Sequence, residues 1–129
     1  MTVYLDAERL LQLVQHLGVG PVRDFGLLDS AAQRPGSTLW GSDAYEGIPL
    51  KAAALLESLT RNHPLVDGNK RLGWLALFVF LDLNGYDLEP PNDDVAYDFV
   101  IGVASGQLEL EQAAATLEPW MLARGATQP

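Results

Sequence analysis

The sequence predicts an all-α fold, a single compact domain of about six helices, and three observations lead to this prediction. The chain has 129 residues, the size of one ordinary domain, and 48% of them are hydrophobic, which suffices for one core. Apolar residues recur at helical spacing along most of its length. Residues that begin and end helices separate these segments, so the pattern favours a helical bundle over alternating strands and helices.

The first two helices are predicted over residues 6–17 and 27–33. In the first segment four apolar residues share one face, and Gly18 can end the helix in a left-handed conformation. The second segment should end before Pro35, because the residue that precedes a proline avoids helical geometry.

Residues 36–49 are predicted to form an extended flap rather than a helix. The segment contains three glycines and one proline, together with Trp40 and Tyr45. We expect it to guide an extended segment of a target protein by strand-like pairing, with the two aromatic side chains as candidate target contacts.

Two longer helices are predicted at the centre of the bundle, over residues 50–62 and 69–84. Pro49 suits a first helical turn, and Gly85 is a suitable residue after a helix end. The apolar run 72–83 is shorter than the roughly 20 residues that a membrane span needs, so we interpret it as part of a core helix.

Two further helices complete the predicted bundle. Asn92 can cap a helix that runs to Ser105, and a last helix is expected over residues 110–122 despite Pro119. The domain is therefore predicted over residues 1–123, with residues 124–129 as a C-terminal tail.

Composition narrows the possible partners and compartments. The formal net charge is −9, which disfavours nucleic acid as a direct partner because phosphate backbones select basic surfaces. The absence of cysteine excludes disulfides, thiolate metal sites and a cysteine nucleophile, and it suits a reducing cytoplasm. Residues 1–9 lack the apolar segment of a signal peptide, so we expect a cytoplasmic protein without membrane attachment.

Residues 63–71 form the segment with the most chemical content. An imidazole, a carboxylate, a glycine, an amide and two cations stand directly before the apolar run. This order indicates a polar loop that leads into the N-terminus of a buried helix, where unpaired N–H groups and the helix dipole favour an anion such as phosphate. The segment reads His63-Pro64-Leu65-Val66-Asp67-Gly68-Asn69-Lys70-Arg71.

The histidine and the carboxylate of this loop each have a functional and a structural interpretation. His63 is a candidate general base, since histidine as a residue type titrates near neutral pH, or it caps a helix end. Asp67 can hold Mg²⁺, which binds one or two carboxylates along with phosphate oxygens and waters. Alternatively, Asp67 caps the following helix, a position that aspartate favours.

The remaining loop residues suit the binding of phosphate. Gly68 allows the backbone to approach a ligand closely, and Asn69 can orient the loop or contact phosphate. Lys70 and Arg71 can neutralise phosphate charge. A helix N-terminus disfavours cations, and a bound anion would remove that conflict.

On these residues, segment 63–71 resembles the signature of the Fic/Doc family, in particular its Doc (death-on-curing) branch. In that signature a histidine leads through a Phe, an acidic residue and a small residue to an Asn and a basic end. Similar flanking segments extend the resemblance over residues 4–120; they are residues 27–31, 51–56, 80–85 and 103–106. The family fold is a small helical bundle, in agreement with the prediction from helical periodicity.

The residue at position 70 separates two activities within this family. Fic enzymes usually carry a second glycine there and transfer AMP to a target hydroxyl. Doc proteins carry lysine, bind ATP in the opposite sense and transfer its γ-phosphate. Lys70 therefore implies a phosphotransferase that uses ATP and Mg²⁺. The resemblance further implies a toxin of a toxin–antitoxin module that phosphorylates a Thr of elongation factor Tu and arrests translation, with a Phd-type antitoxin over the site.

The resemblance also implies roles for individual residues. His63 would deprotonate the acceptor hydroxyl, and Asp67 would hold Mg²⁺. Arg61 matches a further functional cation of the Doc branch. The phosphates would be bound by the backbone of Gly68 and by Asn69, Lys70 and Arg71.

Two residues depart from the family pattern. Leu65 replaces the usual Phe, a core anchor beneath the loop, so the loop can be placed differently. Trp74 stands where adenylylating Fic enzymes carry a second arginine that binds nucleotide phosphate, which argues further against AMP transfer. Trp74, Phe78 and Phe80 are expected in the core, and Trp120 against the last helix or a partner.

Other interpretations stay open. Residues 42–47 match a short inhibitory pattern of Fic proteins, but that pattern acts from a helix, which the flap does not favour, so we interpret the match as chance. AMP transfer to a protein hydroxyl is the enzymatic alternative. A catalytically silent module that holds a helical partner in the same groove is the non-enzymatic alternative.

Overall fold

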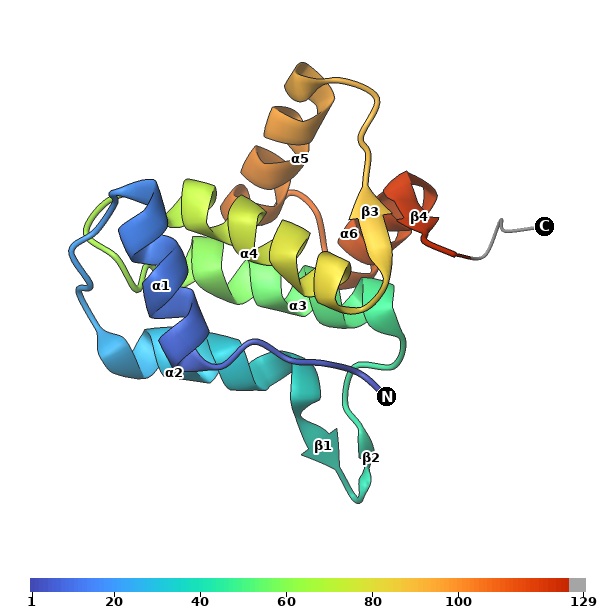
Figure 1. The fold of residues 1–129 in the computed structure, drawn as a ribbon, viewed down its shortest axis with the longest axis horizontal. Helices are drawn as coiled ribbons and strands as arrows, with labels where there is room; N and C mark the ends of the chain where they lie inside the picture. The colour runs from blue at the N-terminus through green and yellow to red at the C-terminus, as the bar shows by residue number, and fades with distance from the viewer. Residues whose placement is uncertain (126–129) are drawn as a thin grey trace.

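The computed structural model describes residues 1–125 and confirms the all-α prediction (Figure 1). These residues form six α-helices, two 3₁₀ turns and two small antiparallel sheets. The helices are α1 (Ala7–Leu17), α2 (Phe25–Gln33), α3 (Ile48–Arg61), α4 (Asn69–Leu83), α5 (Asp93–Ser105) and α6 (Leu110–Leu117). The strands are β1 (Thr38–Leu39), β2 (Ser42–Asp43), β3 (Tyr86–Leu88) and β4 (Met121–Ala123).

Helices α3 and α4 lie side by side at the centre of the molecule (Figure 1). Most of α3 is buried, because its small and aliphatic side chains face neighbours on several sides. The two helices approach closely at Gly73, where an added Cβ would lie 2.9 Å from Thr60 Cγ2. Helices α1 and α2 cover one side of this pair, and α5 and α6 cover another. The polar loop therefore connects the two helices that pack most extensively against the rest of the fold.

Side-chain caps decide where several helices begin, and one of them corrects a predicted boundary. Asp24 accepts a hydrogen bond from the backbone N–H of Leu27, so α2 begins at Phe25, two residues earlier than predicted. Asp6 and Asn92 cap α1 and α5 in the same way. The boundaries of these two helices are close to the predicted ones, because Asp6 and Asn92 can be identified as capping residues from the sequence.

The flap is a short hairpin, as expected for an extended segment. Strand β1 pairs with β2 through Thr38 with Asp43 and Leu39 with Ser42. In Figure 1 the hairpin projects away from the helices, next to the start of α3. Residues 42–47, which match the inhibitory pattern, contain β2 and no helix, in agreement with the interpretation of that match as chance.

The C-terminal segment differs from the prediction, which placed a helix over residues 110–122. Helix α6 ends at Leu117, because Pro119 lacks the N–H that would continue the hydrogen-bond ladder, and a 3₁₀ turn follows. The chain then forms β4, which pairs antiparallel with β3. Trp120 is buried and packs edge-on against Phe99, with 5.2 Å between the ring centroids.

The first residue of the predicted tail, Arg124, forms hydrogen bonds and ion pairs with the domain. Arg124 donates its backbone N–H to Gly85 O, and its guanidinium pairs with Asp82 and Asp87. Arg124 therefore contacts the domain through both its backbone and its side chain. Residues 126–129 of that tail lie outside the described residues.

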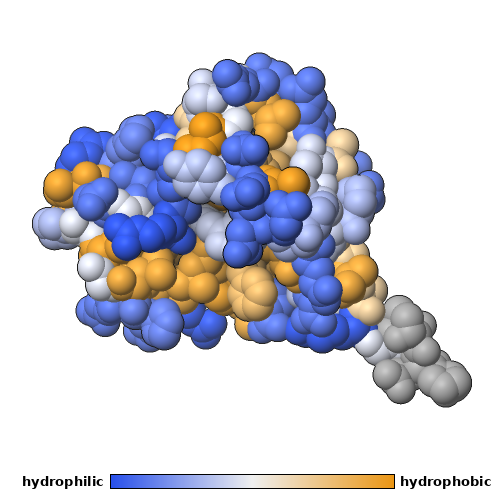
Figure 2. Space-filling view, turned by 90° about the horizontal axis from the view of Figure 1, so that it is seen from above, coloured by the Kyte–Doolittle hydropathy of each residue, from blue (hydrophilic) through white to orange (hydrophobic). Residues whose placement is uncertain are grey.

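Apolar side chains also reach the surface of the molecule, and Figure 2 shows a band of them bordered by polar side chains. Phe80 is buried and Trp74 is partly buried, but Phe78 is exposed, so the prediction of a core position for Phe78 is wrong. The buried residues of α4 recur at helical spacing along one stripe, and position 78 falls outside it. No helix within residues 1–125 has both the length and the apolar character needed to cross a membrane.

Candidate active site

The polar loop runs beside the connection between α1 and α2 (Figure 1). Backbone hydrogen bonds join the two segments. Val66 donates its N–H to Pro21 O over 2.9 Å, and Gly20 donates its N–H to Asp67 O over 3.0 Å. An N-terminal segment thus acts as a strand-like partner for the loop and fixes its path.

His63 is the first residue after the cap of α3, and its backbone is unusual. Its φ is 53°, a left-handed value that costs a residue with a Cβ about 1–3 kcal/mol and that surrounding contacts must impose. The following Pro64 predicts a departure from helical geometry, but not its sign. The imidazole is exposed, and its one polar contact within residues 1–125 is Asn69 Nδ2, 3.4 Å from Nδ1. The ring is therefore open to a reacting group.

Asn69 holds the base of the loop. Its buried side chain accepts the N–H of Leu65 on Oδ1 over 2.9 Å and donates from Nδ2 to Leu65 O over 3.0 Å. These two bonds fix the amide so that Nδ2 faces the imidazole of His63. Of the two predicted roles of Asn69, the orientation of the loop is the one these contacts support. Leu65 is only 1% exposed, so it anchors the loop in the core although it is smaller than Phe.

Gly68 and Asp67 lie where the loop enters α4. Gly68 is the N-cap residue with φ 93°, and an added Cβ would lie 2.4 Å from Val19 Cβ, so only glycine fits here. No side chain caps α4, so the interpretation of Asp67 as its cap is wrong. Instead, Asp67 is exposed, and its carboxylate has no hydrogen-bond or ion-pair partner in residues 1–125.

Lys70 and Arg71 stand in the first turn of α4. Both side chains are exposed, and neither forms an ion pair with another described residue. Because this end of a helix already carries partial positive charge, two cations there are unfavourable without an anion. A cavity of about 360 Å³ lies over the turn and is lined by His63, Val66, Asp67, Gly68, Asn69, Lys70 and Arg71. This loop cavity brings the predicted base, carboxylate and cations together.

A larger and more apolar groove adjoins the loop cavity. It has a volume of about 440 Å³, shares Lys70 and Arg71 with the cavity, and is bordered further on by Trp74 of α4 and by Tyr97 and Val100 of α5. The groove therefore combines the two cations and one carboxylate, that of Asp93, with largely apolar walls. Such a surface suits a ligand or partner segment with an anionic end and an apolar body.

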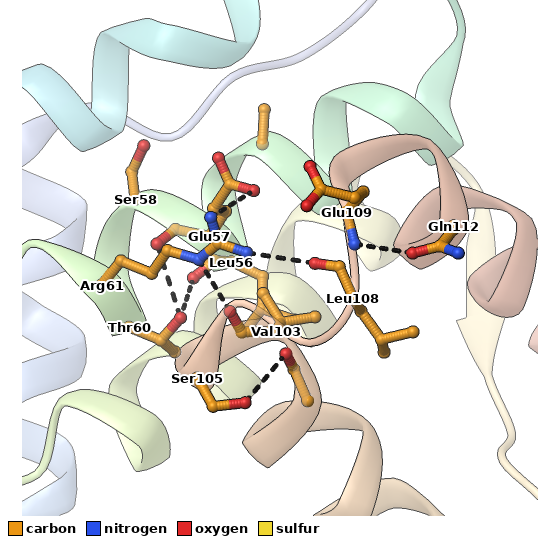
Figure 3. A network of polar contacts seen from close by, with 12 residues as sticks. Leu56, Glu57, Ser58, Thr60, Arg61, Val103, Ser105, Leu108, Glu109 and Gln112 are labelled. Atoms are coloured by element: carbon orange, nitrogen blue, oxygen red, sulfur yellow. Dashed lines mark hydrogen bonds and ion pairs between the residues drawn. The ribbon is translucent and has the colours of Figure 1, made fainter.

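Arg61 does not line the loop cavity, which argues against its predicted role as a phosphate-binding residue. Figure 3 shows its side chain turned toward the connection between α5 and α6. Its Nε donates to Val103 O over 2.8 Å, and Nη2 donates to Leu108 O over 3.0 Å. Nη1 pairs with Glu57 across 3.4 Å. Arg61 stands only two positions before His63 in the sequence. However, Arg61 is the last residue of α3 and His63 follows the cap with a left-handed backbone, so the two side chains have different surroundings.

The two flap aromatics have different environments. Trp40 is 96% exposed at the tip of the hairpin, so it remains a candidate contact for a target protein. Tyr45 is partly buried, and its hydroxyl accepts a hydrogen bond from Arg34 Nε over 2.9 Å. The side chain of Tyr45 is therefore occupied in holding the flap, which argues against its predicted role as a target contact.

Two cations that sequence reasoning did not single out anchor this flap. Lys51 is buried and donates from Nζ to Tyr45 O over 2.6 Å and to Asp43 over 3.0 Å. Burial lowers the pKa of the Arg34 guanidinium, but hydrogen bonds to Tyr45 and Glu57 outweigh this effect and raise the pKa above its ordinary value. The burial of Lys51 could have been predicted, because Lys51 begins an alanine- and leucine-rich segment predicted to be a buried helix.

The polar loop lies within a part of the chain that is similar to known proteins. The model of the Fic/DOC family matches residues 4–81, a range that includes the whole polar loop. A protein named Toxin Doc, from Mycolicibacterium smegmatis, is 48% identical to this chain over 120 residues, which cover 91% of this chain and 92% of that protein. Both the extent of the family match and the identity to this relative lead to one conclusion: the chain belongs to the Fic/DOC family.

Proposed function

We propose that this protein is the toxin of a toxin–antitoxin module and that it transfers the γ-phosphate of ATP to a Thr hydroxyl of a translation factor, with elongation factor Tu as the proposed substrate. Enzymes of the Fic/DOC family transfer a nucleotide or phosphate group to proteins, and the relative from Mycolicibacterium smegmatis is named a toxin. The observation that carries the proposal is the loop cavity, in which His63, Asp67, Lys70 and Arg71 meet at the start of α4.

The loop cavity supplies what phosphoryl transfer requires from a protein. The reaction needs positioning and charge stabilisation more than covalent chemistry. His63 accepts the proton of the acceptor hydroxyl, the hydroxyl oxygen attacks the γ-phosphorus, and the bond to the bridging oxygen of ADP breaks. Lys70 and Arg71, with the first N–H groups of α4, neutralise the charge on the transferred group and on the leaving ADP.

Asp67 is the residue that would hold Mg²⁺. Its exposed carboxylate is free of partners in residues 1–125 and lines the same cavity as the two cations. One carboxylate is sufficient for Mg²⁺, which takes its remaining ligands from phosphate oxygens and water, so these residues fit the ion. When bound, the ion supplies charge neutralisation between phosphate groups.

Lys70 favours phosphate transfer over AMP transfer. Fic enzymes that transfer AMP resemble this chain in the loop but carry a glycine at the position of Lys70 and an arginine at that of Trp74. Here Lys70 adds a positive charge to the lining of the loop cavity, and Trp74 adds an apolar wall to the adjoining groove. Both differences support an orientation of ATP in which the γ-phosphate faces His63.

The adjoining groove supports the second part of the proposal, a Phd-type antitoxin. An amphipathic helix can place its apolar face along Trp74, Tyr97 and Val100 and an acidic side chain against Lys70 or Arg71. A helix bound in this way would cover the cations that ATP needs. The antitoxin would thus inhibit by occupying the phosphate-binding end of the groove.

Isotope labelling tests the proposed reaction. The purified protein is incubated with Mg²⁺, cell extract and either γ-labelled or α-labelled ATP, and the modified protein is identified by its intact mass. We expect label from γ-labelled ATP only, with a mass gain of one phosphate, and no label with the His63→Ala variant. A mass gain of AMP would contradict phosphate transfer. Equal growth arrest by the wild type and His63→Ala would instead indicate a silent binding module.

A further inference from the structure

We propose that Arg23, in the connection between α1 and α2, is a positioning residue that holds His63 in its reactive conformation. Arg23 engages three consecutive carbonyl oxygens at the end of α3. Its side chain donates from Nη2 to Asn62 O over 3.0 Å and from Nε to His63 O over 2.8 Å. Its backbone N–H donates to Pro64 O over 2.7 Å. The inference rests on the proposed function, because it assigns Arg23 to the same reaction.

The chemistry of the guanidinium explains why arginine stands at this place. Nε and Nη2 are adjacent donors in a rigid plane, so one side chain can bind two neighbouring carbonyls at once. The carbonyls of Asn62 and His63 follow the last turn of α3, where oxygen atoms have no partner within the helix. A cation there also interacts favourably with the helix dipole. Arg23 therefore satisfies this helix end and fixes the direction of the peptide planes on both sides of His63.

The backbone of His63 gives this contact its importance. With φ at 53° and a proline after it, His63 does not hold its conformation by local preference. If the Arg23 side chain is removed, the carbonyls of Asn62 and His63 lose these two hydrogen-bond donors, and the peptide is free to rotate toward a more common φ. Such a rotation would swing the imidazole away from the cavity that contains Lys70 and Arg71.

Arg23 is separate from the phosphate-binding cations. The residues that line the loop cavity do not include Arg23, and both hydrogen-bonded nitrogen atoms of its side chain donate to carbonyl oxygens. Its loss should therefore affect the reaction step and leave the binding of ATP intact. This split distinguishes Arg23 from Lys70 and Arg71, whose loss should weaken the binding of ATP.

The kinetic test compares Arg23→Gln and Arg23→Lys with the wild type, using γ-labelled ATP and the acceptor protein identified above. We expect kcat to fall on the order of 10²-fold in Arg23→Gln, because a misplacement of about 1 Å has this effect on a reacting group, while KM for ATP stays within about twofold. Arg23→Lys should recover part of kcat, since an ammonium group donates to a carbonyl but lacks the fork. Arg9→Gln, at an exposed position of α1, is the matched control and should retain the wild-type kcat.

Nuclear magnetic resonance of the imidazole groups tests the same inference without relying on catalysis. The chain has two histidines, and exposed His16 on α1 serves as an internal reference. In Arg23→Gln the ring signals of His63 should shift or broaden, while those of His16 and the far-UV circular dichroism remain as in the wild type.

The outcomes separate this inference from the proposed function. A wild-type protein that transfers no phosphate overturns the proposed function, and the His63 signals then decide the role of Arg23. An unchanged kcat in Arg23→Gln, unchanged His63 signals, or a raised KM for ATP with normal kcat would each overturn the positioning role.

Discussion

Replacement of Gly68 by alanine tests whether the N-terminal segment and the loop are in as close contact as the structure has them. The added methyl group would lie 2.4 Å from Val19 Cβ and 2.6 Å from its Cγ1, at a φ of 93°. The left-handed conformation costs alanine about 1–2 kcal/mol, and the collision adds about 1–3 kcal/mol, as overpacking of a core does. We therefore expect the free energy of unfolding to fall by about 2–5 kcal/mol, a large part of the 5–15 kcal/mol typical of a domain.

Gly85 is a matched control for this substitution. Its φ is 89°, nearly the same as that of Gly68, but an added Cβ would have no atom within 4 Å. Gly85→Ala should therefore show the conformational cost alone, about 1–2 kcal/mol. Urea denaturation followed by circular dichroism gives both values. Equal losses in the two variants would refute the close approach of Val19 to the loop.

Three further substitutions test the contacts of Lys51, Asp43 and Arg61. Lys51→Met should lower the free energy of unfolding by about 1–3 kcal/mol, because buried carbonyls at the base of the flap lose their donor, and limited proteolysis should cut the flap faster. Asp43→Asn, which affects only the exposed partner of Lys51, should cost less than about 1 kcal/mol; an equal loss would mean that the ion pair, not burial, anchors the flap. Arg61→Ala should cost about 1–3 kcal/mol in urea denaturation with unchanged affinity for ATP in calorimetric titration, whereas weakened ATP binding would restore its predicted phosphate-binding role.

Local signals explain which parts of the fold were predictable. Helices α1 and α5 follow from a capping Asp6 or Asn92 and from apolar periodicity, both of which act within a few residues. The loop cavity was predictable for the same reason, because its residues stand within a single nine-residue segment at a helix start. The fully buried Leu65 shows that the anchor position tolerates a smaller side chain than Phe.

Long-range pairing explains what the sequence did not predict. Strands β3 and β4 are short and far apart in the chain, so neither carries a strand signal of its own, and only their pairing makes them strands. Arg61 shows a similar limit: its position in α3 was clear, but its carbonyl partners come from the connection between α5 and α6. The role of Arg23 could not be predicted from a local motif, because its hydrogen-bond partners lie 39 and 40 positions away in the sequence.

The polar loop pairs with the connection between α1 and α2, and this pairing supports the reactive conformation of His63. That conformation therefore depends on whether the connection is in place, both during folding and in the folded protein. Contacts between segments this far apart form only when the fold is largely assembled, since closing a long loop costs entropy. Conversely, the connection can open at a lower free energy than the whole domain, as peripheral segments generally do. In such an opened form His63 would lose the hydrogen bonds that support its left-handed backbone, even if α3 and α4 stayed helical. Activity would then follow the local stability of this peripheral segment more closely than the global stability of the domain.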